Sequence, residues 1–408
     1  MMGPEVLTKW WKEQPAVKLM RVLNNPFDTT RFVGGCVRNT ILQMPITDID
    51  VATKHKPEET IRLLKAAEIT VKATGLSHGT VTAFFGDMRF EITTLRKDIK
   101  TDGRHAVIKF TDCWKEDAKR RDFTINTLLM DQFGEIIDPL SCKQDILDGR
   151  VAFVGCPSKR IQEDALRILR FFRFNAYFGR GLVEQEALNA CKTNAHLLSV
   201  LSEERIREEL FKILASENVC NTLELMQNCS IVEQLFSADI RLSELEALIS
   251  FEKEKADPLR RLAIAFDTKT KTLASRLKLS NKMSSRLSFL KEMQISKSLD
   301  PLSIKSLFYK YGVEEILDLL MVKSALDKDI VKTHLVALEI SKDWHKPIFP
   351  ITGEDIVVLG VAPGVAVGKI LAATENWWIA NNFKPNCADC VAWARCFIES
   401  GKENFNNG

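Results

Sequence analysis

The stretch Phe32-Val33-Gly34-Gly35-Cys36-Val37-Arg38-Asn39 decides how the first domain begins. An apolar run that meets two glycines predicts a strand that turns sharply into a helix. Glycine lets the backbone approach a phosphate closely, and the helix N-terminus adds partial positive charge. Gly34, Gly35 and Arg38 are therefore candidates for a phosphate cradle. A Gly-Gly pair is more often only a turn, so this interpretation depends on the acidic residues further along the chain.

Asp48-Ile49-Asp50-Val51 follows ten residues after Arg38. Side chains alternate along a strand, so Asp48 and Asp50 point to the same face and can hold a metal ion together. Glu91, in the strand-like stretch 90–95, is the candidate third carboxylate, because a buried unpaired carboxylate is costly and requires a partner. The other interpretation of Glu91 is a solvated residue on an edge strand. Mg²⁺ prefers oxygen ligands and keeps positions for substrate phosphate, so three carboxylates suffice.

Periodicity divides the chain into a mixed part and a helical part. Short β-rich runs at 80–85 and 90–95 alternate with glycine turns and predict a small mixed α/β domain. From about Ile161 helical spacing takes over, for example in 202–214 and 258–266, with breaks near 138–139, 216–217, 279–281 and 347–350.

Composition excludes several classes of protein. The chain has 408 residues, 45% of them apolar and 27% charged, which is typical of a globular protein with more than one core. A net charge of +3 does not by itself indicate nucleic-acid binding. The absence of an apolar run of about 18 residues predicts no membrane span, and the N-terminus has no signal-peptide pattern, so a cytoplasmic protein is expected. Cys387 and Cys390 form a CxxC pair that lacks two further zinc ligands nearby.

Further motifs place the chain beside a known family. After the glycine turn and Asp48-Ile49-Asp50 come Arg120-Arg121-Asp122-Phe123-Thr124-Ile125-Asn126, then 163–170 (Glu-Asp-Ala-Leu-Arg-Ile-Leu-Arg) and 201–206 (Leu-Ser-Glu-Glu-Arg-Ile). Together they resemble class II CCA-adding tRNA nucleotidyltransferases and the related bacterial poly(A) polymerases. The resemblance is strongest over 31–214 and returns weakly at 351–364. Asn39 departs from it, because the family usually has Asp there.

The resemblance implies an α+β protein. It comprises a nucleotidyltransferase head (1–138) followed by an elongated all-helical neck (139–215), body (216–280) and tail (281–408). It also implies two-metal transfer of CMP and AMP from CTP and ATP to the 3′ end of tRNA, with two Mg²⁺ ions held by Asp48, Asp50 and Glu91. The oligomeric state does not follow from the sequence.

Six further residues complete the candidate nucleotide site. Arg121 joins Arg38 as a ligand of the triphosphate. Asp122 and Asn126, four apart on an expected helix, share a face and are assigned to the sugar hydroxyls. Asp164 and Arg167, three apart on another expected helix, offer an acceptor beside a donor. Cytosine and adenine both present an amine donor beside a ring-nitrogen acceptor, which this pair complements, whereas uracil and guanine present the opposite pattern. Arg170 continues the three-residue spacing and is assigned to close the pocket. Taken without neighbours, an ordinary surface Asp-Arg pair is the commoner explanation.

Two more charged segments have expected roles, one in the choice of nucleotide and one in binding RNA. Residues 96–104 read as a charged surface loop, and the family has a flexible loop here that reshapes the pocket from CTP to ATP. A basic stripe is expected to meet tRNA phosphates, although such runs are more often solvated helix faces; it comprises Lys269, Lys271, Arg276, Lys278, Lys282 and Arg286. The alternatives that remain are a poly(A) polymerase that adds only AMP and an inactive tRNA-binding protein.

Overall fold

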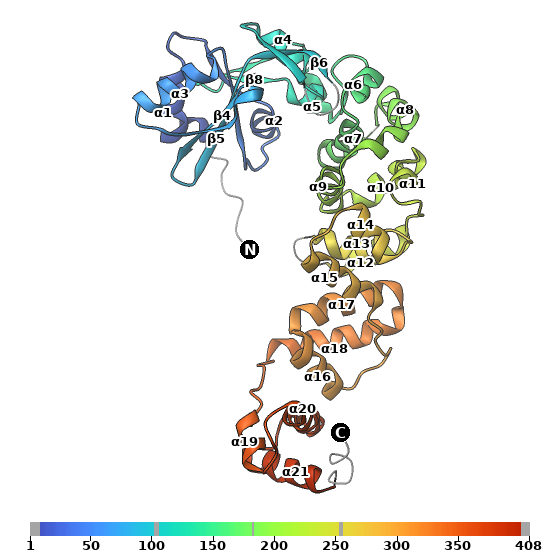
Figure 1. The fold of residues 1–408 in the computed structure, drawn as a ribbon. Coiled ribbons are helices and arrows are strands. Elements are labelled where there is room, and N and C mark those ends of the chain that lie inside the picture. The colour runs from blue at the N-terminus through green and yellow to red at the C-terminus, as the bar shows by residue number, and fades with distance from the viewer. Residues whose placement is uncertain (1–8, 102–105, 182, 253–255, 401–408) are drawn as a thin grey trace. The chain divides into compact units, whose positions relative to one another are not determined.

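The structure, a computed structural model, describes residues 9–101, 106–181, 183–252 and 256–400. Strands are confined to the segment 30–137, and the regular elements after it in the described residues are helices (Figure 1). This confirms the expected α+β class, in which a small mixed domain precedes a helical remainder.

The main sheet has seven strands in the order β3-β4-β5-β2-β1-β8-β9. β2 runs parallel to β5, whereas β1 is antiparallel to both β2 and β8. The strands are β1 (Thr30–Val33), β2 (Ile49–Thr53), β3 (Thr70–Gly75), β4 (Thr80–Phe85), β5 (Met88–Thr94), β8 (Leu129–Met130) and β9 (Ile136–Ile137).

The two faces of this sheet have different neighbours. Phe32, Val51 and Phe90 are buried on the face covered by α1 (Gln14–Leu23) and α3 (Pro57–Ala66). Because side chains alternate along a strand, the neighbouring positions point the other way. Val33 and Ala52 are among them, and they pack with Trp114, the first residue of α4 (Trp114–Lys119). Figure 1 labels these helices and α2 (Gly35–Ile41), which follows β1. The apolar face therefore fixes which residues reach the opposite face.

The charged stretch after β5 is not a surface loop. It begins as β6 (Arg96–Thr101), which pairs antiparallel with β7 (Ala106–Phe110) in a separate two-stranded sheet. Residues 102–104 of that stretch lie outside the described residues. The register pairs Arg96 with Phe110 and Thr101 with Ala106. The charge of 96–101 conceals this strand, because Ile99 is its only apolar residue.

The helices after the sheet were largely predicted from their spacing. The expected helices at 202–214 and 258–266 are confirmed as α9 (Glu203–Leu214) and α13 (Pro258–Ala265). Residues 1–242 and 255–284 form one compact unit. Its other helices after β7 are α4 (Trp114–Lys119), η3 (Thr124–Asn126), α5 (Lys143–Asp148), α6 (Pro157–Glu163), α7 (Leu166–Phe178), α8 (Gln185–Thr193), η4 (Ala195–Val200), α10 (Val219–Asn228), α11 (Ile231–Phe236) and α14 (Thr270–Arg276).

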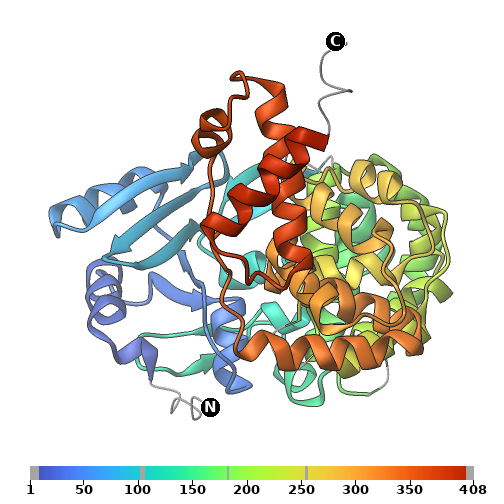
Figure 2. The same cartoon turned by 90° about the horizontal axis from the view of Figure 1, so that it is seen from below.

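Residues 243–254 and 285–408 form the second compact unit. Its helices are α12 (Leu242–Phe251), the greater part of α15 (Asn281–Glu292), α16 (Pro301–Tyr311), α17 (Val313–Leu326), η5 (Lys328–Ile330), α18 (Val331–Lys342), α19 (Gly353–Val358), α20 (Val365–Ala380) and α21 (Cys387–Ser400). α20 and α21, red in Figure 2, pack together around the buried ring of Trp378. The four domain limits expected from the sequence stay predictions.

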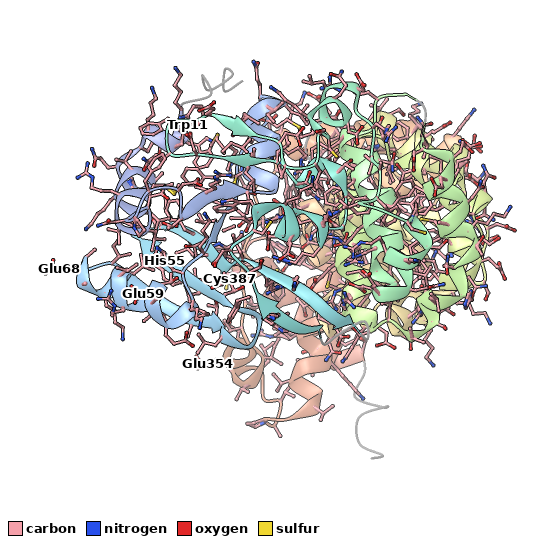
Figure 3. All side chains as sticks on the ribbon, turned by 90° about the horizontal axis from the view of Figure 1, so that it is seen from above. Trp11, His55, Glu59, Glu68, Glu354 and Cys387 are labelled. Atoms are coloured by element: carbon pink, nitrogen blue, oxygen red, sulfur yellow. The ribbon has the colours of Figure 1, made fainter. Side chains whose placement is uncertain are left out.

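Cys387 begins α21, where it is exposed (Figure 3), whereas Cys390 is buried in the apolar core of that unit. Within the described residues, none of the helices is long and apolar enough to cross a membrane.

Half of the expected basic stripe has protein partners. Arg276 donates to the carbonyls of Leu235 and Leu198 at 3.3 and 3.2 Å, respectively. Lys278 pairs with Glu204. Arg286, which belongs to the second unit, pairs with Asp318. These three cations therefore have structural roles, and RNA contact by the stripe stays a prediction.

Candidate active site

Three carboxylates lie near one another where β2 and β5 run side by side. Asp50 on β2 lies directly opposite Glu91 on β5 in the parallel register, and Asp48 precedes Asp50 by two positions. Alternation therefore places Asp50 and Glu91 on the face that looks away from α1 and α3. Asp48, just before β2, reaches the same side of β5, where it pairs with Arg89. β5 lies between β4 and β2, so Glu91 is not on an edge strand, and its side chain is exposed rather than half-buried as expected.

The pKa shifts of these carboxylates show that their charges act on one another. Burial raises the pKa of Asp50, and the charges of Glu91 and Asp48 raise it further, although Arg121 acts in the opposite direction. A hydrogen bond from Arg89 lowers the pKa of Asp48, with a smaller contribution from the charge of Lys212. Mutual repulsion among acids is the feature that a bound cation would relieve.

The donor set fits a divalent cation of the magnesium type, because each side chain offers carboxylate oxygens. As the side chains stand, no three acidic, histidine or cysteine residues in the described part of the chain converge in a metal-binding arrangement. Arg89 Nη2 instead donates to Asp48 Oδ1 at 2.6 Å, and both side chains are well exposed. A metal that binds Asp48 through Oδ1 would compete with this guanidinium.

Arg89→Gln is therefore expected to strengthen the binding of Mn²⁺ by up to about 5-fold, because an exposed ion pair contributes about 0.2–1 kcal/mol. Electron paramagnetic resonance of free Mn²⁺ during a titration measures the affinity without requiring turnover. Arg62→Gln is the matched control, since it removes a similar exposed pair with Glu59 on α3 (Figure 3). Equal affinities for Mn²⁺ in both variants would contradict competition at Asp48.

The two-glycine turn brings the backbone against the carboxylates. Gly34 has a φ of +71° and directly precedes α2. A Cβ at this position would lie 3.3 Å from Arg121 Nη1 and 3.5 Å from Asp50 Oδ2. A side chain here would be strained and would enter the space between the guanidinium and the acid, so glycine is required on both counts.

Arg121 is held rigidly at this turn. Its Nη2 donates to Asp117 Oδ2 at 3.2 Å, and its Nη1 donates to the carbonyl of Asn126 at 3.3 Å. Burial alone would raise the pKa of Asp117, but the charges of Arg121 and Arg120 outweigh it and hold that pKa below its usual value. Asp117 therefore stays ionised and anchors a cation beside Asp50.

A chain of hydrogen bonds connects α2 to α7. Arg38 Nη1 donates to Asn126 Oδ1 at 2.6 Å, Asn126 Nδ2 donates to Asp122 Oδ1 at 3.2 Å, and Arg170 Nε donates to Asp122 Oδ2 at 2.7 Å. Asp122 and Asn126 do meet, but not on one helix as expected: α4 ends at Lys119, and a turn precedes η3. The turn, rather than helical spacing, places the two side chains together.

Burial and neighbouring charges change the pKa values of Arg38 and Asp122 in this hydrogen-bond network. Burial lowers the pKa of Arg38 to about 10, with a further contribution from Arg173, and its guanidinium lies 3.9 Å from the ring centroid of Phe178. Burial of Asp122 works against ionisation, but Arg170 outweighs it and brings the pKa of Asp122 down to about 2. Both side chains are therefore charged at neutral pH.

Asn39 has a defined place in this network. Its Oδ1 accepts from Arg38 Nε and Nη2 at 3.2 and 3.0 Å, and its Nδ2 donates to the carbonyl of Pro45 at 2.7 Å. An aspartate at this position could accept the same bonds from Arg38 but could not donate to Pro45. The departure from the family pattern is thus compatible with a folded site.

Asp164 and Arg167 do not share a helix. Asp164 is extended at the end of α6, and α7 starts only at Leu166. Asp164 Oδ2 accepts from Arg205 Nη2 at 2.8 Å, whereas Arg167 Nη1 donates to Glu163 Oε2 at 2.6 Å. The expectation of a direct pair on one helix face is wrong, because the chain breaks between the two residues and each takes another partner.

One cavity of about 910 Å³ is nevertheless lined by every residue proposed from the sequence. These are Gly34, Gly35, Arg38, Asp48, Asp50, Glu91, Arg121, Asp122, Asn126, Asp164, Arg167 and Arg170. The cavity also has lining residues that the sequence analysis gave no role: Arg89, Arg120, Arg173, Tyr177, Phe178, Arg205 and Lys212. Arg173 continues the three-residue spacing of Arg167 and Arg170, which was a usable signal, but Tyr177 and Lys212 belong to no motif.

Comparisons with known proteins agree with this geometry. Residues 30–152 match the family described as poly A polymerase head domain, and residues 183–238 match one described as probable RNA and SrmB-binding site of polymerase A. The CCA tRNA nucleotidyltransferase 1, mitochondrial, of Homo sapiens is 32% identical over 375 residues, which is 87% of this chain and 83% of that protein. The CCA-adding enzyme of Ligilactobacillus salivarius (strain UCC118) is 30% identical over 86% of this chain and 88% of its own length.

Solved structures share the fold. The Bacillus stearothermophilus CCA-adding enzyme in complex with CTP superposes with a TM-score of 0.75 at 23% identity, covering 96% of this chain and 98% of that one. The Thermotoga maritima CCA-adding enzyme complexed with tRNA has a TM-score of 0.65 at 20% identity, covering 94% and 95%. With relatives above 30% identity across most of its length and a cavity lined by all the expected residues, the chain belongs to the CCA-adding tRNA nucleotidyltransferase family.

Proposed function

We propose that this protein completes the 3′ ends of tRNA by adding CMP and AMP, taken from CTP and ATP, without a nucleic-acid template. The observation that supports this most directly is the set of three carboxylates, Asp48, Asp50 and Glu91, on one face of the sheet and at one wall of an arginine-lined cavity. Relatives that span most of the chain are named for CCA addition, which favours this function over AMP-only extension.

The reaction forms a bond between the RNA 3′ oxygen and the α-phosphorus and breaks the bond to the departing pyrophosphate. Two Mg²⁺ ions held by Asp48, Asp50 and Glu91 would lower the pKa of the attacking hydroxyl and neutralise phosphate charge. The chain itself supplies the cradle: Gly34 admits the triphosphate close to the backbone, while Arg38 and Arg121 donate to its oxygens. Asp122 and Asn126 orient Arg170 and Arg38 and border the space assigned to the sugar.

Nucleotide choice is assigned to the wall formed by Asp164 and Arg167. Cytosine and adenine each present an amine donor beside a ring-nitrogen acceptor, which a carboxylate and a guanidinium complement. Arg205 holds the carboxylate, and Glu163 holds the guanidinium, so the two groups are oriented separately. Uracil or guanine would leave polar groups unpaired, at a cost of about 1–3 kcal/mol per group.

Arg167→Ala is expected to reduce the preference for CTP over UTP by about 10-fold or more, because one side of the matching edge is lost. The measurement is kcat/KM for each nucleotide with the same tRNA. Arg150→Ala is the control, since Arg150 is exposed, pairs with Asp145 and is not among the residues lining the cavity. Unchanged selectivity in Arg167→Ala would remove this residue from base recognition.

The function itself is tested by incubating the protein with tRNA that ends before CCA, Mg²⁺ and labelled CTP or ATP. Ordered addition of C, C and A supports the proposal. Extension by A alone identifies a poly(A) polymerase, and no incorporation with retained tRNA binding identifies an inactive binding protein. The cytoplasmic location stays a prediction, for which cell fractionation is the test.

A further inference from the structure

The wall of the cavity contributed by α7 and α9 carries an exposed aromatic ring that the proposed chemistry leaves unused. Tyr177, the next-to-last residue of α7, is 41% exposed and lines the cavity. Its hydroxyl donates to the carbonyl of Lys212 on α9 at 3.0 Å. This bond fixes the tip of the ring and leaves its exposed surface at the cavity.

Lys212 adds a cation to the same wall. Its side chain is 53% exposed, and its Nζ lies 4.0 Å from Glu209 Oε1, beyond hydrogen-bond distance. Lys212 lines the same cavity as Asp48. The Tyr177–Lys212 wall, meaning these two residues, therefore presents a ring and a cation to the cavity that also contains the three carboxylates.

The triphosphate is already assigned to Gly34, Arg38 and Arg121. A Cβ on Gly34 would lie 3.3 Å from Arg121 Nη1 and 3.5 Å from Asp50 Oδ2, so this cradle adjoins Asp50. In phosphoryl transfer the attacking and leaving oxygens lie in line on opposite sides of phosphorus. If the leaving pyrophosphate is held by the cradle, the attacking 3′ hydroxyl approaches from the far side of the α-phosphorus, so the acceptor needs cavity-lining residues outside the cradle.

The cavity is large for a ligand site. Pockets for one small ligand range over about 300–1,000 Å³, and this cavity of about 910 Å³ is at the upper end. Stacking on an aromatic ring accepts every base, because each base has a π face, and a lysine near the backbone contacts a phosphate. Both contacts suit an RNA end whose last base changes as nucleotides are added.

We propose that Tyr177 and Lys212 form the subsite for the 3′-terminal nucleotide of the RNA acceptor, with the Tyr177 ring stacked on its base and the Lys212 ammonium on its phosphate. The inference deepens the proposed function and rests on it. The competing explanation is that Tyr177 is only a structural tie between α7 and α9 through its hydroxyl.

Substitutions at Tyr177 separate these explanations. Tyr177→Phe removes the hydroxyl and keeps the ring, whereas Tyr177→Ala removes both, and Tyr177→Leu keeps an apolar side chain without a π face. We expect tRNA lacking CCA to bind about 10-fold more weakly to the Ala and Leu variants and within about 2-fold of the wild type to the Phe variant. The KM for CTP should stay unchanged. A loss in Tyr177→Phe as large as in Tyr177→Ala would overturn the proposal.

A matched change on the RNA makes the test specific to stacking. The second acceptor is the same tRNA with an abasic 3′-terminal nucleotide, and fluorescence anisotropy in the absence of CTP and ATP gives both affinities. Wild-type protein should bind the abasic tRNA about 10-fold more weakly, whereas Tyr177→Ala should not distinguish the two. Additive losses would show that ring and base do not meet. Urea unfolding of each variant verifies that the fold is intact.

The phosphate contact is tested through salt dependence. Lys212→Gln should reduce the slope of log affinity against log salt concentration by about 0.7, as expected for one contact to a single strand. Lys192→Gln on α8, an exposed lysine that is not among the cavity-lining residues, is the control and should leave the slope unchanged. Equal slopes in all three proteins would remove Lys212 from the subsite.

Failure of the inference and failure of the proposed function have different outcomes. A wild-type protein that adds no nucleotide to tRNA refutes the function. A wild-type protein that adds C, C and A while Tyr177→Ala and Tyr177→Leu keep normal affinity for both acceptors refutes the subsite alone.

Discussion

Asp50→Asn is expected to lower CMP incorporation by about 1,000-fold or more while tRNA binding stays within about 2-fold of the wild type. Asp50 lies between Val33 and Glu91 in the sheet, and the charges of Asp48 and Glu91 act on it. The amide has the same shape but carries no charge, so it weakens a metal site that supplies several kcal/mol of transition-state stabilisation. Single-turnover incorporation of labelled CMP measures the effect.

Asp87→Asn is the control for Asp50→Asn. Asp87 is an exposed carboxylate in the turn between β4 and β5, close in sequence to the site, and does not line the cavity. Its variant should keep full activity. Activity above about one tenth of the wild type in Asp50→Asn would argue against Asp50 as a metal ligand.

Asp122→Ala is expected to destabilise the fold by about 1–3 kcal/mol, because it leaves the partly buried Arg170 and the other hydrogen-bond donors to Asp122 without their carboxylate. The side chain of Asp122 is only 12% exposed and accepts hydrogen bonds from Phe123 N and Asn126 as well as from Arg170. The free energy of unfolding in urea measures the loss. CTP binding should weaken too, since Asn126 and Arg38 lose their orientation.

A thermodynamic cycle shows how much of this loss belongs to the ion pair. The double variant Asp122→Ala with Arg170→Met should be less destabilised than the sum of the two single changes, because no unpaired charge remains. If the two losses simply add, Asp122 and Arg170 are not coupled.

Asp122 also predicts a pH dependence of stability. Its pKa of about 2 in the folded protein lies below its ordinary value of 3.8, so the unfolded chain takes up the proton first as the pH falls. The stabilisation, about 2 kcal/mol, is therefore present above about pH 4 and is lost as the pH falls toward 2. Unfolding of Asp122→Asn should lack this component between pH 4 and 2.

The local parts of the site were accessible from the sequence because they depend on short-range rules. Two glycines after an apolar run predicted the turn into α2, and strand alternation placed Asp48 and Asp50 on one face. Helical spacing likewise located α9 and α13. In each case the determining residues are within a few positions of one another.

Helical spacing misled where a single residue breaks the helix. Asp164 and Arg167 have the spacing of a helical pair, but the extended backbone at Asp164 separates α6 from α7. Asp122 and Asn126 meet through a turn rather than along a helix. Spacing alone does not reveal such breaks, because the residues on both sides keep a helical pattern.

The sequence by itself determined the family, the α+β class and the identity of the acids and glycines that line the cavity. Only the tertiary structure decided which charge meets which: Asp164 binds Arg205 41 residues away, Asp122 binds Arg170 48 residues away, and Arg38 reaches Asn126 across 88 residues. It also decided that Tyr177 and Lys212 face the same cavity as Asp48. The residue type fixes the charge of a side chain, but the packing of sheet and helices fixes which partner that charge meets. This packing depends on the apolar residues of the whole unit, which lie far apart in the sequence.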